Sequence, residues 1–129
     1  MTPPTARIAT LRVPTSSVLA AWSAHDWRGG VHVDDLVALD RVVVKTHNST
    51  YEIIVVSVES AEILVRGGAF FPDFTPARLA GSSLGGAFLK LRSVHVGFRL
   101  EIATERGFVL TSPVRSIERA GEPADASIM

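Results

Sequence analysis

The chain has 129 residues, which is enough for one domain with its own hydrophobic core. Hydrophobic residues make up 47% and charged residues 20%, a composition that argues against intrinsic disorder. The formal net charge is zero and there is no cysteine, which excludes disulfides and thiolate metal sites. We see neither a secretory leader nor an apolar run near the about 20 residues that cross a bilayer, so we expect a cytoplasmic protein without membrane contacts.

The first 30 residues read as an N-terminal arm with one short helix. Ser16 and Ser17 precede good helix formers and can cap a helix that ends near Trp27. The next segment, 33–40, has two interpretations. Asp34 could cap a single helical turn there, or the segment could be a turn that leads into the first core strand.

Three strands are predicted in the first half of the β region. The β-branched runs 41–46 and 51–58 flank the turn formers of 47–50, a pattern typical of a hairpin. A third strand, 62–66, ends at a pair of glycines.

The clearest alternation of apolar and polar residues runs from 94 to 102. It predicts one long strand with Val96 on the apolar face and His95 on the solvent-exposed face. Gly97 in its middle suggests a bulge or a sharp bend. A further strand, 108–111, should end at Pro113 or lie at a sheet edge, because proline has no N–H to donate.

Five or six short strands with a bent central one favour a mainly β fold. We expect a small antiparallel barrel or half-barrel of the SH3-like or Sm-like kind, with a two-layer sheet under the N-terminal helix as the alternative. The expected organisation is an arm over 1–30, a β domain over 31–119 and a disordered tail over 120–129.

The segment 67–87 is predicted to be a long glycine-rich loop of 21 residues. Structureless loops beyond about 12–15 residues are uncommon and often functional. One helical turn could form at 75–79. Phe70, Phe71 and Phe74 make the loop too apolar for a linker, so they either plug the domain's own core or form a patch for a partner.

The glycines of Gly81–Gly86 could direct backbone N–H groups at an anion, with Arg78 and Lys90 as counter-charges. The spacing fits neither a dinucleotide fingerprint nor a P-loop, and a tight crossover that folds an apolar flap over the domain explains the glycines as well. The run also fits G-x-S-x-G, with Ser82 as the variable residue and Ser83 as nucleophile. A strand rather than a helix follows, which disfavours a hydrolase.

The histidines show no metal-ligand spacing. His32 with Asp34 and Asp35 could hold a metal in principle, but solvated turn residues are the preferred interpretation. We therefore expect no metal and no cofactor.

The favoured function is a binding or assembly module that is not an enzyme and associates with itself or with another protein. A small hydrolase or transferase that uses the glycine run is one alternative, and it needs a base within about 3 Å of the Ser83 hydroxyl. A weak RNA or single-strand binder is the other. The candidate ligand- or partner-binding residues are Phe70, Phe71, Phe74, Arg78, Ser82, Ser83 and Lys90. The candidate nucleic-acid contacts are Lys45, Arg66, Lys90, Arg92 and Arg99.

Overall fold

The computed structural model describes residues 20, 22–84 and 89–120. The predicted cap at Ser16 and Ser17, the glycines at 85 and 86, and the predicted tail beyond residue 120 lie outside these residues. Residue 20 and residues 22–24 are helical, and the rest is mainly strand, as predicted. Among the described residues, no helix has the length and apolar character to cross a membrane.

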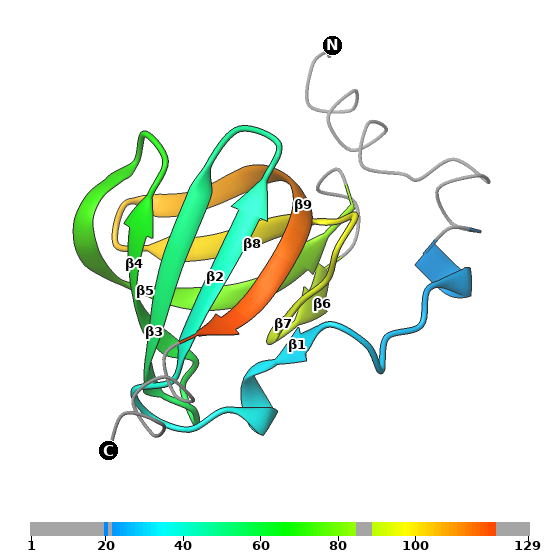
Figure 1. Ribbon diagram of the computed structural model, residues 1–129, viewed down its shortest axis with the longest axis horizontal. Helices are drawn as coiled ribbons and strands as arrows, with labels where there is room; N and C mark the ends of the chain where they lie inside the picture. Colours follow the sequence, from blue (N-terminus) through cyan, green and yellow to red (C-terminus); the bar gives the residue numbers. More distant parts are fainter. Residues whose placement is uncertain (1–19, 21, 85–88, 121–129) are drawn as a thin grey trace, which may run out of the picture.

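Nine strands and one 3₁₀ turn make up the described β region (Figure 1). Their bounds are β1 Val31–His32, η1 Val33–Asp35, β2 Arg41–Thr46, β3 Thr50–Ser57, β4 Glu62–Gly67, β5 Phe71–Ser83, β6 Leu89–Leu91, β7 Ser93–Val94, β8 Arg99–Thr104 and β9 Gly107–Ala120. All their pairings are antiparallel.

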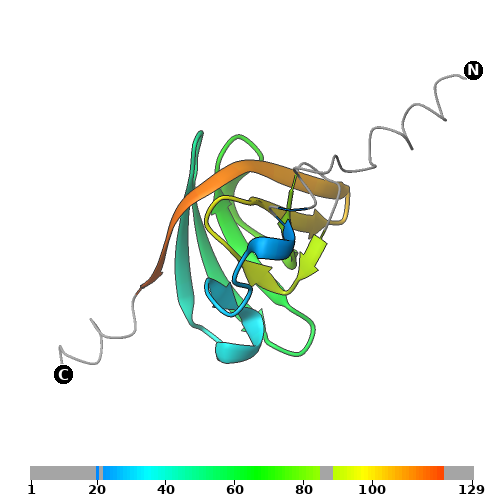
Figure 2. The same ribbon diagram turned by 90° about the vertical axis from the view of Figure 1, so that its right-hand side faces the viewer.

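Hydrogen bonds run through six strands in the order β4-β3-β2-β9-β8-β5 and return from β5 to β4. We refer to these six as the strand ring. β6 continues the sheet beyond β5, and β1 pairs with β7 separately. Residues 22–24 and β1 lie on the β6–β7 side of the ring, away from β3 and β4 (Figure 1, Figure 2).

Alternation along the strands places the core inside the ring. On β2, Val42 and Val44 are buried, whereas Arg41 and Lys45 face solvent. The predicted β2–β3 hairpin is confirmed, with Thr46 accepting the Ser49 N–H at its side-chain oxygen. The buried apolar side chains of the strand ring come from all six strands, which is why closure protects them from water. They include Val42, Val44, Tyr51, Ile53, Val55, Ile63, Val65, Phe71, Leu79, Leu100, Ile102 and Val114.

The predicted glycine-rich loop 67–87 and its helical turn 75–79 are wrong, because residues 71–83 form the strand β5. Its first half pairs with β4 and its second half with β8 and β6. Pro72 and Pro76 argued against a strand in the sequence, because proline has no N–H to donate to a neighbouring strand. Both lie in the first half, where β4 is β5's one partner among the described strands, so their missing N–H groups break no second ladder.

The predicted long strand 94–102 is two strands, β7 and β8, separated by a bend at 95–98. The bend includes Gly97, at φ +94°, as the sequence suggested. The alternation does not continue across it. His95 is therefore buried, with 1% of its surface exposed, and Val96 is 52% exposed, the reverse of the prediction.

β9 does not end at Pro113 but continues to Ala120. Residues 107–113 pair with β8, and residues 114–120 pair with β2. Pro113 stands where β9 changes neighbours, and its carbonyl accepts the His47 N–H. Because β9 pairs first with β8 and then with β2, it connects these two strands within the ring.

Candidate functional site

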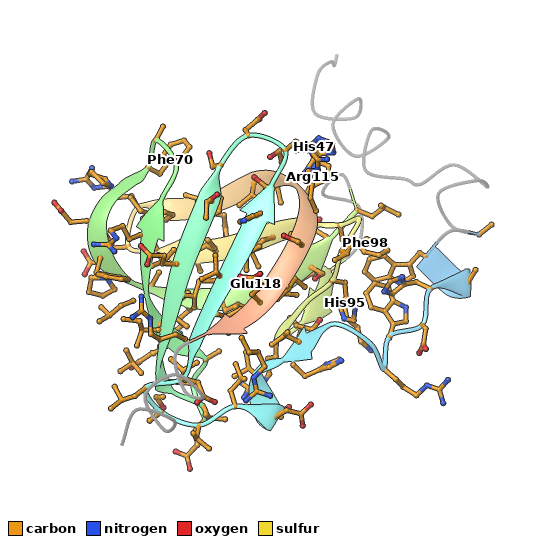
Figure 3. The ribbon with its side chains drawn as sticks, viewed as in Figure 1. His47, Phe70, His95, Phe98, Arg115 and Glu118 are labelled. Carbon is orange, nitrogen blue, oxygen red and sulfur yellow. The ribbon has the colours of Figure 1, made fainter. Side chains whose placement is uncertain are left out.

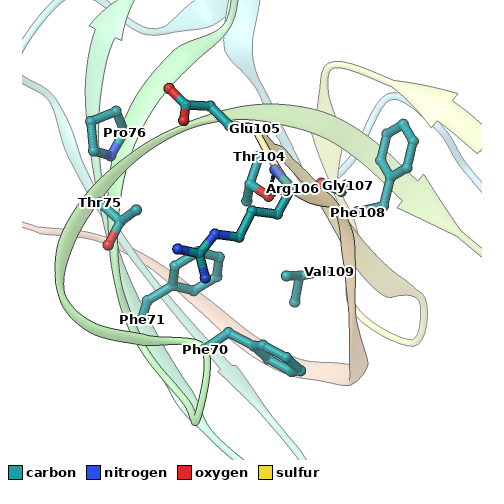
Figure 4. A pocket seen from close by; sticks show the side chains of 10 residues that line it. All are labelled: Phe70, Phe71, Thr75, Pro76, Thr104, Glu105, Arg106, Gly107, Phe108 and Val109. Atoms are coloured by element: carbon teal, nitrogen blue, oxygen red, sulfur yellow. Dashed lines mark hydrogen bonds between the residues drawn. The ribbon is translucent and has the colours of Figure 1, made fainter.

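A groove of about 620 Å³ opens where β5 and β8 separate. β8 pairs with β5 as far as Ala103, opposite Arg78, and the β8–β9 hairpin then continues without β5 beside it. The first half of β5 forms one wall and this hairpin forms the other (Figure 4). The groove is thus a direct consequence of the way β5 divides its pairing between β4 and β8.

Aromatic side chains dominate the groove. Phe71 belongs to the core and is only 2% exposed, whereas Phe70 at the rim is 69% exposed. Phe108 is 70% exposed and projects from the hairpin away from the hollow, while Val109 faces it (Figure 4). Fully burying a phenylalanine side chain stabilises by roughly 1.5–3 kcal/mol. Burial of the two exposed rings at this groove would therefore favour association with a partner.

Two opposite charges stand on the tip of the same hairpin. Arg106 extends across the groove towards Phe71 (Figure 4), and Glu105 is its neighbour. Neither forms an ion pair within the described part of the chain. The tip is fixed by Thr104, whose hydroxyl donates to the Gly107 carbonyl at 2.9 Å and accepts the Arg106 N–H at 3.1 Å.

The structure separates the residues predicted to bind a partner. Phe70 and Phe71 line the groove, but Phe74 does not. The Arg66 guanidinium stacks 4.2 Å above the centre of the Phe74 ring. Arg78 lies 4.0 Å from Glu62 on β4. Lys90 on β6 pairs with Ser82 of the glycine run, its ammonium lies 5.7 Å from the centre of the Trp27 ring, and it does not line the groove. Of the predicted set, Phe70 and Phe71 therefore line the groove, with Phe70 exposed at its rim and Phe71 buried in the core.

The two candidate serines are both buried. Ser82 donates its hydroxyl to the Ser93 carbonyl at 2.9 Å and accepts the His95 N–H at 3.0 Å, which ties β5 to β7. Ser83 is 1% exposed. A nucleophile needs access to its substrate, so the burial of Ser83 counts against the hydrolase hypothesis.

Three of the proposed nucleic-acid contacts are held by other groups of the protein. Arg66 binds Glu52, Arg92 binds Asp34 at 2.7 Å, and Arg99 donates to the Thr111 carbonyl at 3.1 Å. Cations that are already held by protein groups contribute little to a phosphate-binding footprint.

A cluster of histidine and aromatic rings packs residues 22–32 onto the bend at 95–98 (Figure 3). Trp27 and His25 contact Phe98, with ring centroids 5.1 and 4.6 Å apart, and His25 Nε2 lies 3.1 Å from His95 Nδ1. Burial, with the nearby positive charges of His25, His32 and Lys90, lowers the pKa of His95 from 6.5 to about 4. His95 is therefore neutral at pH 7, and this cluster anchors the N-terminal segment.

The acidic residues near His32 do not join it. Asp34 pairs with Arg92, and His32 Nε2 donates to the Gly29 carbonyl at 3.0 Å. Within the described ranges, no three histidine, aspartate or glutamate side chains are grouped closely enough to hold a metal.

Sequence reasoning did not single out Phe108, Glu105 or Arg106 as candidate site residues, and it placed Phe108 at the start of the strand 108–111. The sequence did show a phenylalanine directly after a polar turn. Whether that ring is exposed depends on which face of the hairpin the core covers, and the sequence does not show this. Comparison with protein-family models, with curated proteins and with solved structures finds no match, so the case for function rests on this geometry.

Proposed function

We propose that this protein is a non-enzymatic assembly module, a small closed barrel of the SH3-like or Sm-like kind that pairs with a second copy of itself. The observation that carries the proposal is the combination of a hollow and a protruding aromatic ring on one surface. The hollow lies between Phe70, Phe71 and Val109, and Phe108 projects from the hairpin beside it.

A surface of this shape is self-complementary. In a two-fold pair, residue i of one copy contacts residue j of the other, and j contacts i. Phe108 of each copy can then enter the hollow of the other, so both rings leave water. The pocket volume is within the range of about 300–1,000 Å³ that accepts sizeable apolar groups.

Charge supports a second copy over a partner of one charge sign. The hairpin tip carries one acid and one base, Glu105 and Arg106, so each copy offers the counter-charge that the other needs. The whole chain has a formal net charge of zero, so two copies meet without long-range repulsion.

The competing mode of assembly is the open edge of β6. Leu91 there is 65% exposed, and an edge strand can accept a strand from a neighbour. Leu91 and Phe108 therefore form a matched pair of test positions, since both are exposed and apolar but belong to different surfaces.

The experiment is sedimentation velocity over a range of protein concentrations. We expect the native chain to form a dimer, Phe108→Ser to weaken it by at least about a hundredfold in Kd because two rings per dimer are lost, and Leu91→Ser to match the native chain. Circular dichroism and thermal melting should show both variants folded. A native chain that stays monomeric, or a dimer lost in L91S and kept in F108S, would overturn the proposal.

A further inference from the structure

A second hollow, of about 470 Å³, lies on the outer surface where the β2–β3 turn meets β9. All eight residues that line it are polar, and none is acidic. Three of them can carry positive charge, namely Lys45, His47 and Arg115. Figure 3 shows His47 and Arg115 together beside the turn.

A β-bulge places Arg115 at this hollow. Lys45 pairs with Ser116 and Thr46 pairs with Val114, which leaves Arg115 as an extra residue of β9 without a partner on β2. Bulges of this kind redirect a side chain, and they occur frequently at binding sites. Val114 points into the core, so the bulge brings Arg115 to the outer face on which Lys45 stands.

Among the described residues, the basic side chains of this hollow differ from most other lysines and arginines because no described carboxylate neutralises them. Six arginines form ion pairs within 4.0 Å: Arg28, Arg41, Arg66, Arg78, Arg92 and Arg119. In the described segments, Lys45, His47 and Arg115 form none.

The carboxylates on the neighbouring strands do not fill this role. Glu118 lies further along β9, opposite Val43, and Figure 3 shows it apart from His47 and Arg115. Glu52 on β3 is already held by Arg41 and Arg66, and these bonds lower its pKa, the Arg66 hydrogen bond most of all. The hollow therefore keeps an excess of positive charge.

We infer that this hollow binds the phosphate group of a phosphate monoester. A guanidinium offers two parallel N–H donors to phosphate oxygens, and an ammonium adds a point charge, so Arg115 and Lys45 together match a dianion. Thr50 and Ser116 are the residues paired with Lys45 on its two neighbouring strands, and their hydroxyls can donate to the remaining oxygens. The site lies away from the groove and does not depend on self-association.

The test is a titration of the ¹⁵N-labelled full chain with inorganic phosphate and then with glycerol 3-phosphate, followed by NMR. We expect saturable shifts confined to residues 45–50 and 114–117. Arg115→Gln should weaken binding at least about tenfold, the effect of losing a charge-assisted hydrogen-bond pair. Arg28→Gln removes an exposed arginine that lies outside both this hollow and the groove, and it should leave binding within about twofold of the native value.

Two results would overturn the inference. One is the absence of saturable shifts with either soluble ligand together with no Arg115-dependent binding to vesicles, and the other is an equal loss in R28Q and R115Q, which would mean general charge screening. Co-sedimentation with phosphatidic acid vesicles distinguishes the source of the phosphate. Arg115-dependent binding to vesicles alone would assign a lipid headgroup, whereas binding of glycerol 3-phosphate without vesicle binding would assign a soluble ester.

Discussion

His95 is a histidine held where water does not reach it, and its surroundings control both its charge and its packing. Its Nδ1 pairs with His25, its Nε2 is buried without a hydrogen-bond partner among the described residues, and Ser82 accepts its backbone N–H. Gly30 makes this approach possible, because a Cβ there would stand 2.6 Å from His95 Nδ1 and 2.4 Å from the Val94 carbonyl oxygen.

This environment predicts how stability depends on pH. The pKa of His95 is about 4 in the folded chain, against 6.5 for the ordinary group, so between these values the unfolded chain binds the extra proton. The stability that the neutral, buried His95 adds to the folded chain is therefore complete above pH 6.5, and it is lost as the pH falls towards 4. The urea concentration at the midpoint of unfolding should fall from pH 7.5 to 6 to 5. In His95→Gln, this midpoint should change less with pH.

His47→Gln is the matched control, since His47 is exposed on the β2–β3 turn and lies outside the buried cluster. It should keep the native slope. The pKa values of Asp26 and Glu52 are lowered, by hydrogen bonds from Arg28 and Arg66 respectively, so these carboxylates titrate below the range examined. An H95Q variant with an undiminished slope would contradict the assignment to His95.

Among the elements, β5 determines the shape of the molecule, and Gly81 is the residue that lets it do so. Here β5 carries one extra residue against β8 and lies between β8 and β6. Gly81 has φ +150°, and a Cβ at this position would stand 2.1 Å from the Lys90 carbonyl oxygen. The backbones of β5 and β6 cannot move apart far enough to relieve this clash while the hydrogen bonds between them remain intact.

Gly81→Ala should therefore destabilise the fold by about 2–4 kcal/mol, combining backbone strain with a backbone clash. Gly29→Ala is the control, because a Cβ there meets nothing closer than 3.6 Å, and we expect a change within about 0.5 kcal/mol. Chemical denaturation of the three chains measures both values. Equal stability of G81A and the native chain would contradict the placement of β6 against β5.

The elements that sequence could predict are those with local pairing. The β2–β3 hairpin and β4 follow from β-branched runs and adjacent turns, and their inward and outward residues alternate as expected. β5 and β9 were misread because each pairs with its neighbour in sequence over one half and with a more distant strand over the other, and because Pro76 and Pro113 look like strand ends when the pairing is unknown.

The sites were harder to predict than the strands. Phe70 was identified because it belongs to a group of three phenylalanines too apolar for a linker, but Phe108 needed knowledge of which hairpin face the core covers. Arg115 depends on a bulge, and a bulge is a property of the pairing between two strands that neither strand reveals alone.

At the scale of the whole molecule, closing six strands into a ring leaves few open backbone edges, so side chains must supply most of any interface. The surface around Phe70 and Phe108 offers both an apolar hollow and balanced charge. We propose that this surface pairs with its own copy.

A charge-reversal pair tests this claim most directly. Glu105→Arg gives the hairpin tip two positive charges, and Arg106→Glu gives it two negative charges, on exposed residues that do not support the core. Each variant alone should be monomeric through repulsion between like charges, while an equimolar mixture should form a heterodimer.

The measurement is sedimentation equilibrium of E105R, R106E and their equimolar mixture at low salt. Two monomers that combine into a dimer on mixing would confirm pairing through the hairpin tip, because recovery on mixing cannot arise from damage to either fold. Two variants that each remain dimeric, or a mixture that stays monomeric while the native chain is a dimer, would contradict the account.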